Sequence, residues 1–345
     1  MSKEKGRVVV ITGGTAGVGR ATARLFAGKG ASIAVLSRGK DRLEATRKEL
    51  ATLGARVLAI PTDVADAQQV ETAARIVEDE LGPIDVWINN AMASVFSPIA
   101  EMKPEEYLRV TQVTYLGYVH GTMAALKRMR PRDKGIIIQV GSALAYRGIP
   151  LQSAYCAAKH AVVGFTASLR TELMHDNSRV RVCLVHLPAV NTPQFSWVKS
   201  RLSRRAQPVP PIYQPEIIAK AIHWASHRDR REILVGFPTY RAIWGNKIAP
   251  SWADHFLAAN GFMAQQTQQP ENPSRPDNLW EPPAGDYGCH GDFDARATSH
   301  SPLLWLTMHR KQLALAAVAV IALAGLRAGK NKFFGRTECC SSHDL

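Results

Sequence analysis

A tyrosine and a lysine, Tyr155 and Lys159, stand four residues apart in the stretch SAYCAAKHAVVGF. Residues four apart share one face of an α-helix, so the lysine ammonium can lie beside the tyrosine phenol. A tyrosine has an ordinary pKa of about 10, and a neighbouring cation favours its phenolate. Such a pair can exchange a proton near neutral pH, but it also arises by accident on packed helices. The rest of the chain must decide between these interpretations.

A glycine-rich turn follows the first strand-like stretch, in the sequence ITGGTAGVGRATARLF. Gly13, Gly17 and Gly19 allow a tight turn, and they let backbone N–H groups approach a pyrophosphate at the start of the following helix. Many glycine-rich turns exist for steric reasons alone. The position between the first strand and the first helix favours a dinucleotide site.

The second strand ends at Ser37, which is followed by Arg38. An NAD site usually places an acidic residue here for the ribose 2′-hydroxyl, whereas a guanidinium suits a 2′-phosphate. The sequence therefore favours NADP(H) over NAD(H). A solvated surface arginine is the alternative interpretation.

Short runs of Val and Ile alternate with longer helical patterns up to about residue 236. This rhythm predicts βαβ units, and hence an α/β fold with one Rossmann-type, doubly wound parallel sheet of about seven strands and helices on both faces. The expected strands are 7–12, 32–37, 56–61, 85–89, 135–140, 179–185 and 232–235. The expected helices are 17–29, 40–53, 66–81, 103–130, 152–175 and 215–227.

The rhythm fails after residue 236, so we expect three parts: an NADP-binding catalytic domain at 1–240, an extension or linker at 241–300, and an apolar helix with basic flanks and a tail at 301–345. Residues 265–300 are rich in Pro, Gln, Asn, Asp and Gly, which is typical of an extended segment laid over a domain surface. Residues 313–326 carry no charge and would span about 21 Å as a helix, against about 30 Å of bilayer hydrocarbon. Membrane attachment and packing against protein both stay open for this segment.

The formal net charge of +14 attracts anions such as phosphorylated cofactors, lipid headgroups and nucleic acid. The cations are spread along the chain without an aromatic-interleaved patch, so we expect no nucleic-acid partner. The five cysteines are scattered and form neither a disulfide pattern nor a metal-binding pattern. The N-terminus has no apolar secretion segment. We expect a cytoplasmic protein without a metal, with membrane association through 313–326 as the open alternative.

Taken together, these motifs resemble those of the short-chain dehydrogenase/reductase family over about residues 6–240. The matching elements, in order, are TGxxxGxG at 12–19, Asp63 after the third strand, NNA at 89–91, Ser142 after the fifth strand, Tyr155 and Lys159, and the stretch 188–192 after the sixth strand. Each motif alone is weak, but their order and spacing as a set are specific.

The resemblance implies a reaction in which hydride passes between a nicotinamide and the carbon of an alcohol, ketone or aldehyde. Tyr155 would be the general acid/base, Lys159 would lower its pKa and hold the ribose, and Ser142 would orient the carbonyl. The cofactor residues implied are Thr12, Gly13, Thr15, Gly17, Val18, Gly19, Ser37, Arg38, Asp63, Val64, Asn90, Tyr155, Lys159, Pro188, Val190 and Thr192. The family also implies a homodimer or homotetramer, built on helix 152–175 and the second half of 103–130.

Three positions depart from the family's pattern. Thr114 stands where an asparagine usually interrupts the helix and holds a water in a proton relay, so it is the fourth catalytic position. Its single hydroxyl can instead bond back to its own helix. Ala189 and Met92 replace glycines, and Met92 would crowd the nicotinamide. Thr114 keeps open a second function: an NADP(H)-binding, redox-responsive interaction protein with little turnover.

The segment 194–213 occupies the place of the family's substrate lid. Phe195 and Trp197 can cover an apolar ligand, which favours an apolar small-molecule alcohol or carbonyl as substrate. Three lid arginines would either face an acidic group or stay solvated, namely Arg201, Arg204 and Arg205. A serine hydrolase is disfavoured because Ser142 lies in VGSAL, which lacks the G-x-S-x-G elbow.

Overall fold

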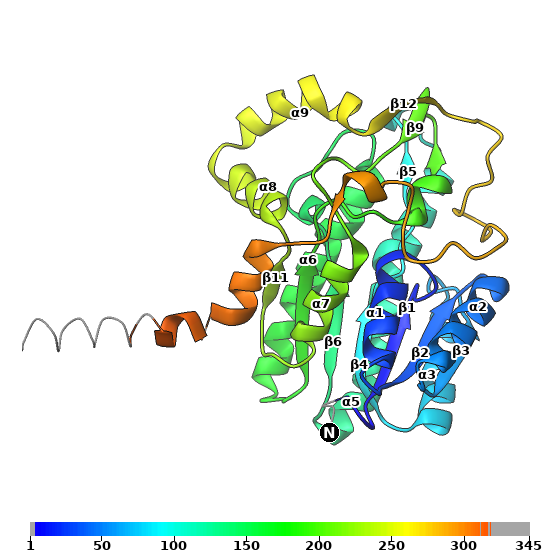
Figure 1. Ribbon diagram of the computed structural model, residues 1–345, viewed down its shortest axis with the longest axis vertical. Coiled ribbons are helices and arrows are strands. Elements are labelled where there is room, and N and C mark those ends of the chain that lie inside the picture. The colour runs from blue at the N-terminus through cyan, green and yellow to red at the C-terminus, as the bar shows by residue number, and fades with distance from the viewer. Residues whose placement is uncertain (1–3, 311, 317, 319–345) are drawn as a thin grey trace, which may run out of the picture. The chain divides into compact units, whose positions relative to one another are not determined.

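A computed structural model describes residues 4–310, 312–316 and 318 of the protein. Its centre is a parallel sheet with the strand order β11-β7-β6-β4-β1-β2-β3 (Figure 1). The strands are β1 (Val8–Thr12), β2 (Ser32–Ser37), β3 (Val57–Pro61), β4 (Ile84–Asn89), β6 (Ile136–Val140), β7 (Arg181–His186) and β11 (Glu232–Leu234). The order reverses between β1 and β4, and such a switch point opens a crevice at the carboxyl ends of the strands. The seven-stranded, doubly wound prediction is confirmed.

Helices cover both faces of this sheet. On one face α1 packs between α2 and α7, and on the other α3 packs on α5 and α4 on α6. Their bounds are α1 (Gly17–Ala27), α2 (Lys40–Thr52), α3 (Ala67–Leu81), α4 (Pro104–Thr111), α5 (Gly117–Arg132), α6 (Ser153–His175) and α7 (Pro215–Ala225). Because both faces are covered, the strands are apolar along their length; all five residues of β1 are buried.

The predicted helix 103–130 is interrupted. A π-helical turn, Gln112–Leu116, separates α4 from α5. Within it the Thr114 hydroxyl donates to the Ala93 carbonyl oxygen (2.8 Å) and accepts from the Ala93 N–H (2.9 Å). Single π turns are rare and often lie at functional sites. The helical prediction for 103–130 holds from α4 through α5, but it did not include the π turn, because helical periodicity does not register one extra residue in a turn.

Two helices follow β11 that the sequence did not predict, α8 (Phe237–Ile248) and α9 (Pro250–Ala264). Both carry a proline in the first turn, the same signal that marks α4 and α7. Three short strand pairs join distant parts of the chain: β5 (Val95–Phe96) with β8 (Lys199–Ser200), β9 (Arg204–Ala206) with β12 (Gln266–Pro270), and β10 (Ile212–Tyr213) with β13 (Ala297–Thr298). Short 3₁₀ turns lie at Ile99–Glu101, Ala143–Ala145, Pro193–Ser196 and Asp294–Arg296.

Residues 277–291, here called the strap, lie on the domain without helix or strand (Figure 1). Leu279 is fully buried in the cluster that contains Val64 and Val113, and Cys289 is also buried. The Gly17 N–H donates to the Gly288 carbonyl oxygen (3.1 Å). The expectation that this part of the chain lies over the domain is confirmed, and it also adds side chains to the core.

The compact unit runs from Met1 to Ser301, beyond the boundary at residue 240 that the sequence suggested. A second unit begins at Pro302, and its described residues 302–310 and 312–316 are helical. Most of the segment 313–326 lies outside the described residues. Among the helices that the structure describes, none combines the length and the apolar character needed to cross a bilayer.

Candidate active site

A cavity of about 580 Å³ lies at the carboxyl ends of the strands. The loops after β1, β2, β3, β4, β6 and β7 all contribute to its wall, as the switch-point geometry requires. The sequence-predicted residues that line it are Gly13, Thr15, Gly17, Val18, Ser37, Arg38, Asp63, Val64, Asn90, Ser142, Tyr155, Lys159, Pro188, Val190 and Thr192. Thr12, Gly19 and Thr114 do not line the cavity.

Thr12 acts from behind the wall by tying the glycine turn to the end of β4. Its hydroxyl accepts hydrogen bonds from the backbone N–H groups of Asn90 (3.0 Å) and Ala91 (3.1 Å). The Asn90 side-chain amide donates in turn to the carbonyl oxygens of Thr12 and Gly13 (both 3.1 Å). These bonds hold the turn against the neighbouring strand.

The glycines of the turn are required by conformation and by close approach. Gly13 and Gly17 have φ values of +63° and +53°, in the left-handed region that favours glycine. A Cβ on Gly19 would lie 2.2 Å from the Gly13 carbonyl oxygen. The turn therefore presents bare backbone at the start of α1, an arrangement that fits the pyrophosphate of a dinucleotide.

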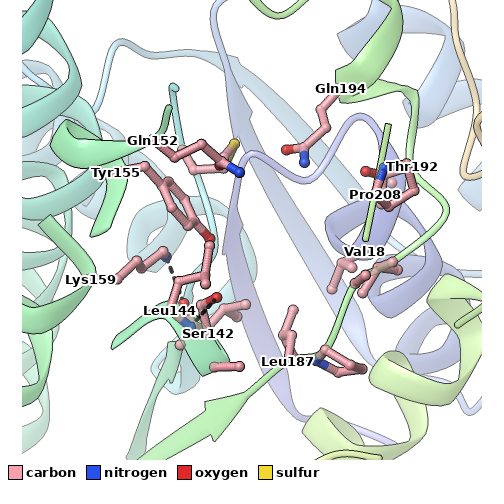
Figure 2. Close-up of a pocket in the computed structure, with 18 of the residues that line it drawn as sticks. Val18, Ser142, Leu144, Gln152, Tyr155, Lys159, Leu187, Thr192, Gln194 and Pro208 are labelled. Carbon is pink, nitrogen blue, oxygen red and sulfur yellow. Dashed lines mark hydrogen bonds between the residues drawn. The ribbon is translucent and has the colours of Figure 1, made fainter. Parts of the chain in front are cut away.

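Ser142, Tyr155 and Lys159 stand together on one side of the cavity (Figure 2). Ser142 begins a short 3₁₀ turn after β6, and its hydroxyl accepts from the Leu144 N–H (3.1 Å). Tyr155 and Lys159 lie one turn apart on α6. The Lys159 ammonium is buried and donates to the Tyr118 hydroxyl and the Val140 carbonyl oxygen (both 2.8 Å).

Burial controls the acidity of this group. It raises the pKa of Tyr155 above its ordinary value, and a hydrogen bond with Ser142 only partly opposes that effect. Burial also lowers the pKa of Lys159 to about 7. The Lys159 ammonium lies 5.6 Å from the centre of the Tyr155 ring.

Thr114 does not take the place expected for a relay residue. Both hydrogen bonds of its hydroxyl go to the backbone of Ala93, on the loop after β4. The expectation that the hydroxyl bonds back to its own helix is also wrong, because the π turn presents it to that loop. Thr114 anchors the loop that includes Met92, which lines the cavity as expected.

Arg38 lines the cavity, but its guanidinium is engaged by the strap. It donates to the carbonyl oxygens of Asn278, Leu279 and Trp280. Asn278 itself lines the cavity beside it. The Arg38 guanidinium, which the sequence assigned to a 2′-phosphate, thus also binds backbone carbonyl oxygens of the strap.

The lid side chains divide into two groups. Phe195 and Trp197 are buried and line the cavity, as expected for residues that cover an apolar ligand. The three lid arginines bind groups of the chain itself: Arg201 pairs with Glu106 (2.7 Å), Arg204 donates to Gln268 (2.7 Å) and Arg205 pairs with Asp292. These partners replace the acidic ligand that the sequence left open.

Two residues of the site were not predicted from the sequence. Tyr118 accepts a hydrogen bond from Lys159, and Arg109 forms an ion pair with Asp63. The Arg109 guanidinium contacts the Asp63 carboxylate (2.6 Å) and the Leu279 carbonyl oxygen (3.1 Å). Neither residue lies in a motif of the sequence. The only signal for Tyr118 was its position four residues after Thr114, one helical turn further along.

A family model described as "short chain dehydrogenase" matches residues 7–201 of the chain. The uncharacterized oxidoreductase YxnA of Bacillus subtilis is 31% identical over 330 residues, which cover 95% of this chain and 91% of that protein. The chain belongs to the short-chain dehydrogenase family. It is thus an oxidoreductase of the family that uses a nicotinamide cofactor and acts on CH–OH groups.

Other members of the short-chain dehydrogenase family resemble most of this chain. A dehydrogenase/reductase SDR family protein 7-like of Anopheles gambiae is 31% identical over 71% of this chain and 80% of its own. An alcohol dehydrogenase of the archaeon Thermococcus sibiricus, complexed with 5-hydroxy-NADP, matches with a TM-score of 0.58 at 26% identity, over 66% of this chain and 95% of that one. A short-chain dehydrogenase/reductase of Burkholderia phymatum in complex with NAD has a TM-score of 0.63 at 23% identity and covers 76% of this chain and 98% of its own; it supports the fold alone.

Proposed function

We propose that this short-chain dehydrogenase is NADP(H)-dependent and interconverts an apolar alcohol with a ketone or aldehyde. One observation carries the proposal: Ser142, Tyr155 and Lys159 converge on the cavity whose opposite wall includes Val18 of the glycine turn (Figure 2). A carbonyl bound between these walls meets a proton donor on one side and the cofactor position on the other.

The chain's own groups perform the proton chemistry. The Ser142 hydroxyl holds the substrate oxygen, and the Tyr155 hydroxyl donates its proton to that oxygen during reduction or accepts it during oxidation. The Lys159 ammonium stabilises the phenolate that forms, and its burial strengthens this electrostatic interaction. A bound nicotinamide supplies or accepts the hydride.

The lining of the cavity supports an apolar substrate. The apolar residues of the cavity wall include Leu144, Ile149, Leu187, Phe195, Val209, Trp252, Phe256 and Leu257. Gln152, beside Tyr155, and Gln194, across the cavity from it, contribute polar groups to the wall (Figure 2). Pockets of this kind bind apolar molecules and orient them through a few polar contacts.

The test is NADPH oxidation with a panel of apolar ketones and aldehydes, comparing the wild type with Tyr155→Phe. We expect kcat to fall by about 10²-fold or more in the variant, because general acid catalysis contributes about 10²–10⁴-fold. The dissociation constant of NADPH, measured by fluorescence, should stay within a factor of about two to three. Tyr115→Phe is the matched control and should keep wild-type kcat, since Tyr115 packs on Phe165.

Two results would contradict the proposal. If the wild type binds neither pyridine dinucleotide, the cofactor assignment fails. If it binds NADPH tightly but no carbonyl gives turnover that depends on Tyr155, the catalytic assignment fails and an interaction role for the bound dinucleotide replaces it.

The preference for NADP(H) rests on Arg38, which directly follows Ser37 at the end of β2. The T. sibiricus enzyme was studied with an NADP derivative, which agrees with this choice. In Arg38→Ala we expect NADPH affinity to fall about tenfold or more and NADH affinity to change far less, as for loss of a charge-assisted contact. An equal loss for both dinucleotides would show that Arg38 serves the strap alone.

We also propose a homodimer or homotetramer built on α5 and α6. Met123 on α5 and Met174 on α6 are 63% and 70% exposed in the single chain, which suits faces that pair with another copy. Light scattering during gel filtration measures the mass directly, and a monomer at micromolar concentration would exclude this assembly.

A further inference from the structure

A second tyrosine lies directly beneath the lysine of the site. Tyr118 on α5 is 1% exposed, and its hydroxyl accepts a hydrogen bond from the Lys159 ammonium (2.8 Å). The same hydroxyl donates to the Val140 carbonyl oxygen (3.0 Å), which also accepts from Lys159 (2.8 Å). The ammonium, the phenol and the carbonyl therefore form a closed triangle at the carboxyl end of β6.

This triangle accounts for the buried charge of Lys159. A buried ammonium needs hydrogen-bond acceptors to replace its water. Within the described part of the chain, no carboxylate lies within 4.0 Å of Lys159 Nζ, and the titratable groups around it are Tyr118 from α5 and Tyr155 from its own helix. An ammonium has three N–H donors. Tyr118 and Val140 take two of them, so one remains for the cavity that Lys159 lines.

The backbone of Tyr118 is held by a buried side chain of β4. The buried Asn89 side chain donates to the Tyr118 carbonyl oxygen (3.2 Å), to Thr122 (3.1 Å) and to Gln139 (2.9 Å). The Tyr118 backbone is thus fixed to β4 and β6 rather than to α5 alone. A rigid acceptor can hold the flexible lysine side chain in one rotamer.

Thr114 does not supply this support. Its hydroxyl has an acceptor and a donor on Ala93, so it is committed to the loop after β4. The residue on α5 that contacts the lysine is Tyr118, one helical turn further on.

We propose that Tyr118 is a positioning residue of the reaction: by accepting from the Lys159 ammonium it keeps that group protonated and directs its remaining N–H toward Tyr155 and the cofactor. This inference rests on the proposed function. Without the phenol oxygen, one N–H of the ammonium loses its acceptor, so neutral lysine is favoured. The phenolate of Tyr155 then loses electrostatic support.

The first test measures the lysine itself, without cofactor or substrate. ¹³Cε-labelled lysine is titrated by NMR in the wild type, Tyr118→Phe and Tyr115→Phe, and Lys159→Met assigns the signal. In Tyr118→Phe we expect the Lys159 titration to move to lower pH by about one unit, as for loss of one hydrogen bond to a charged group. Tyr115→Phe should leave it unchanged.

The second test is the pH profile of alcohol oxidation, a direction that needs Tyr155 to accept a proton. In Tyr118→Phe the acidic limb of kcat should move up by about one pH unit and the maximal kcat should fall about tenfold, with KM nearly unchanged. Replacing Tyr118 by 3-fluorotyrosine keeps the hydroxyl with a less basic oxygen and should give intermediate shifts. It also tests the proposal should Tyr118→Phe fail to fold.

Unchanged lysine titration and unchanged pH profiles in folded Tyr118 variants would overturn the inference. A fall in kcat without a pH shift would do the same, since it would indicate a merely structural role. If the wild type binds no pyridine dinucleotide, the proposed function fails, and the NMR titration still shows whether Tyr118 controls the charge of Lys159. The two failures are therefore distinguishable.

Discussion

Glycine is needed at position 19 and not at position 164, because the space beside the two backbones differs. A Cβ on Gly19 would lie 2.2 Å from the Gly13 carbonyl oxygen, a backbone atom of the same turn that Asn90 also holds. A Cβ on Gly164, within α6, would meet nothing within 4 Å. A glycine-rich motif thus depends on contacts that each glycine makes, rather than on glycine content.

We expect Gly19→Ala to abolish dinucleotide binding, because the turn must open to admit the methyl group. Gly164→Ala should retain binding and raise the free energy of unfolding by about 0.5–1 kcal/mol, since alanine loses less backbone entropy in a helix. Dinucleotide fluorescence titration and urea unfolding measure the two effects. Wild-type affinity in Gly19→Ala would contradict the account of the turn.

The strap is held by hydrogen bonds to its backbone and by side chains such as Asp286, which pairs with Arg20, and its composition could not show which residues would hold it. Arg38 and Arg109 both donate to the Leu279 carbonyl oxygen, and Arg42 donates to that of Pro283. The Leu279 side chain is the apolar anchor of this part. A segment rich in proline and asparagine can pack on a domain when the domain supplies the arginines and the apolar pocket.

We expect Leu279→Ala to loosen the strap and to speed dissociation of the dinucleotide. A buried leucine truncated to alanine costs about 2–5 kcal/mol, and here the loss falls next to Asn278, which lines the cavity. Stopped-flow displacement of NADPH should show a dissociation rate about tenfold or more above the wild type. The control is Gln269→Ala in exposed β12, which should show the wild-type rate. An equal rate in Leu279→Ala would mean that the strap does not enclose the cofactor.

At the scale of the whole molecule, packing and composition divide the chain at different places. Composition changes near residue 240, whereas the compact unit ends at Ser301. The difference arises because residues after 264 complete the domain: Leu279 joins the main core, and Phe293 packs on Phe195 at a ring separation of 5.8 Å.

A chain ending at Ser301 should therefore keep the melting temperature of the full chain within a few degrees. A chain ending at Ala264 loses Leu279 and Phe293 and should melt about 10 °C or more lower, since several kcal/mol of burial are removed. Differential scanning calorimetry compares the three chains. Equal melting temperatures for all three would place the domain boundary before the strap.

Much of the fold could be predicted from the sequence because it depends on local patterns. All seven strands of the sheet were found, since a parallel strand covered on both faces must be apolar along its length, as β1 and β2 are. The unexpected helices α8 and α9 show the limit of the pattern. Only Gly261 is buried in α9, so this helix lacks the stripe of buried apolar residues that makes a helix recognisable in a sequence.

The sequence by itself placed Tyr155 and Lys159 on one helix, the glycine turn between the first strand and the first helix, and the strands of the sheet, because local spacing and periodicity specify each of them. Only the tertiary structure decided that Lys159 is held by Tyr118, 41 positions away, and that Arg38 is held by carbonyls about 240 positions away. Backbone geometry relates near neighbours in the chain. Contacts between distant residues depend on how whole elements pack, and neither spacing nor composition contains that information.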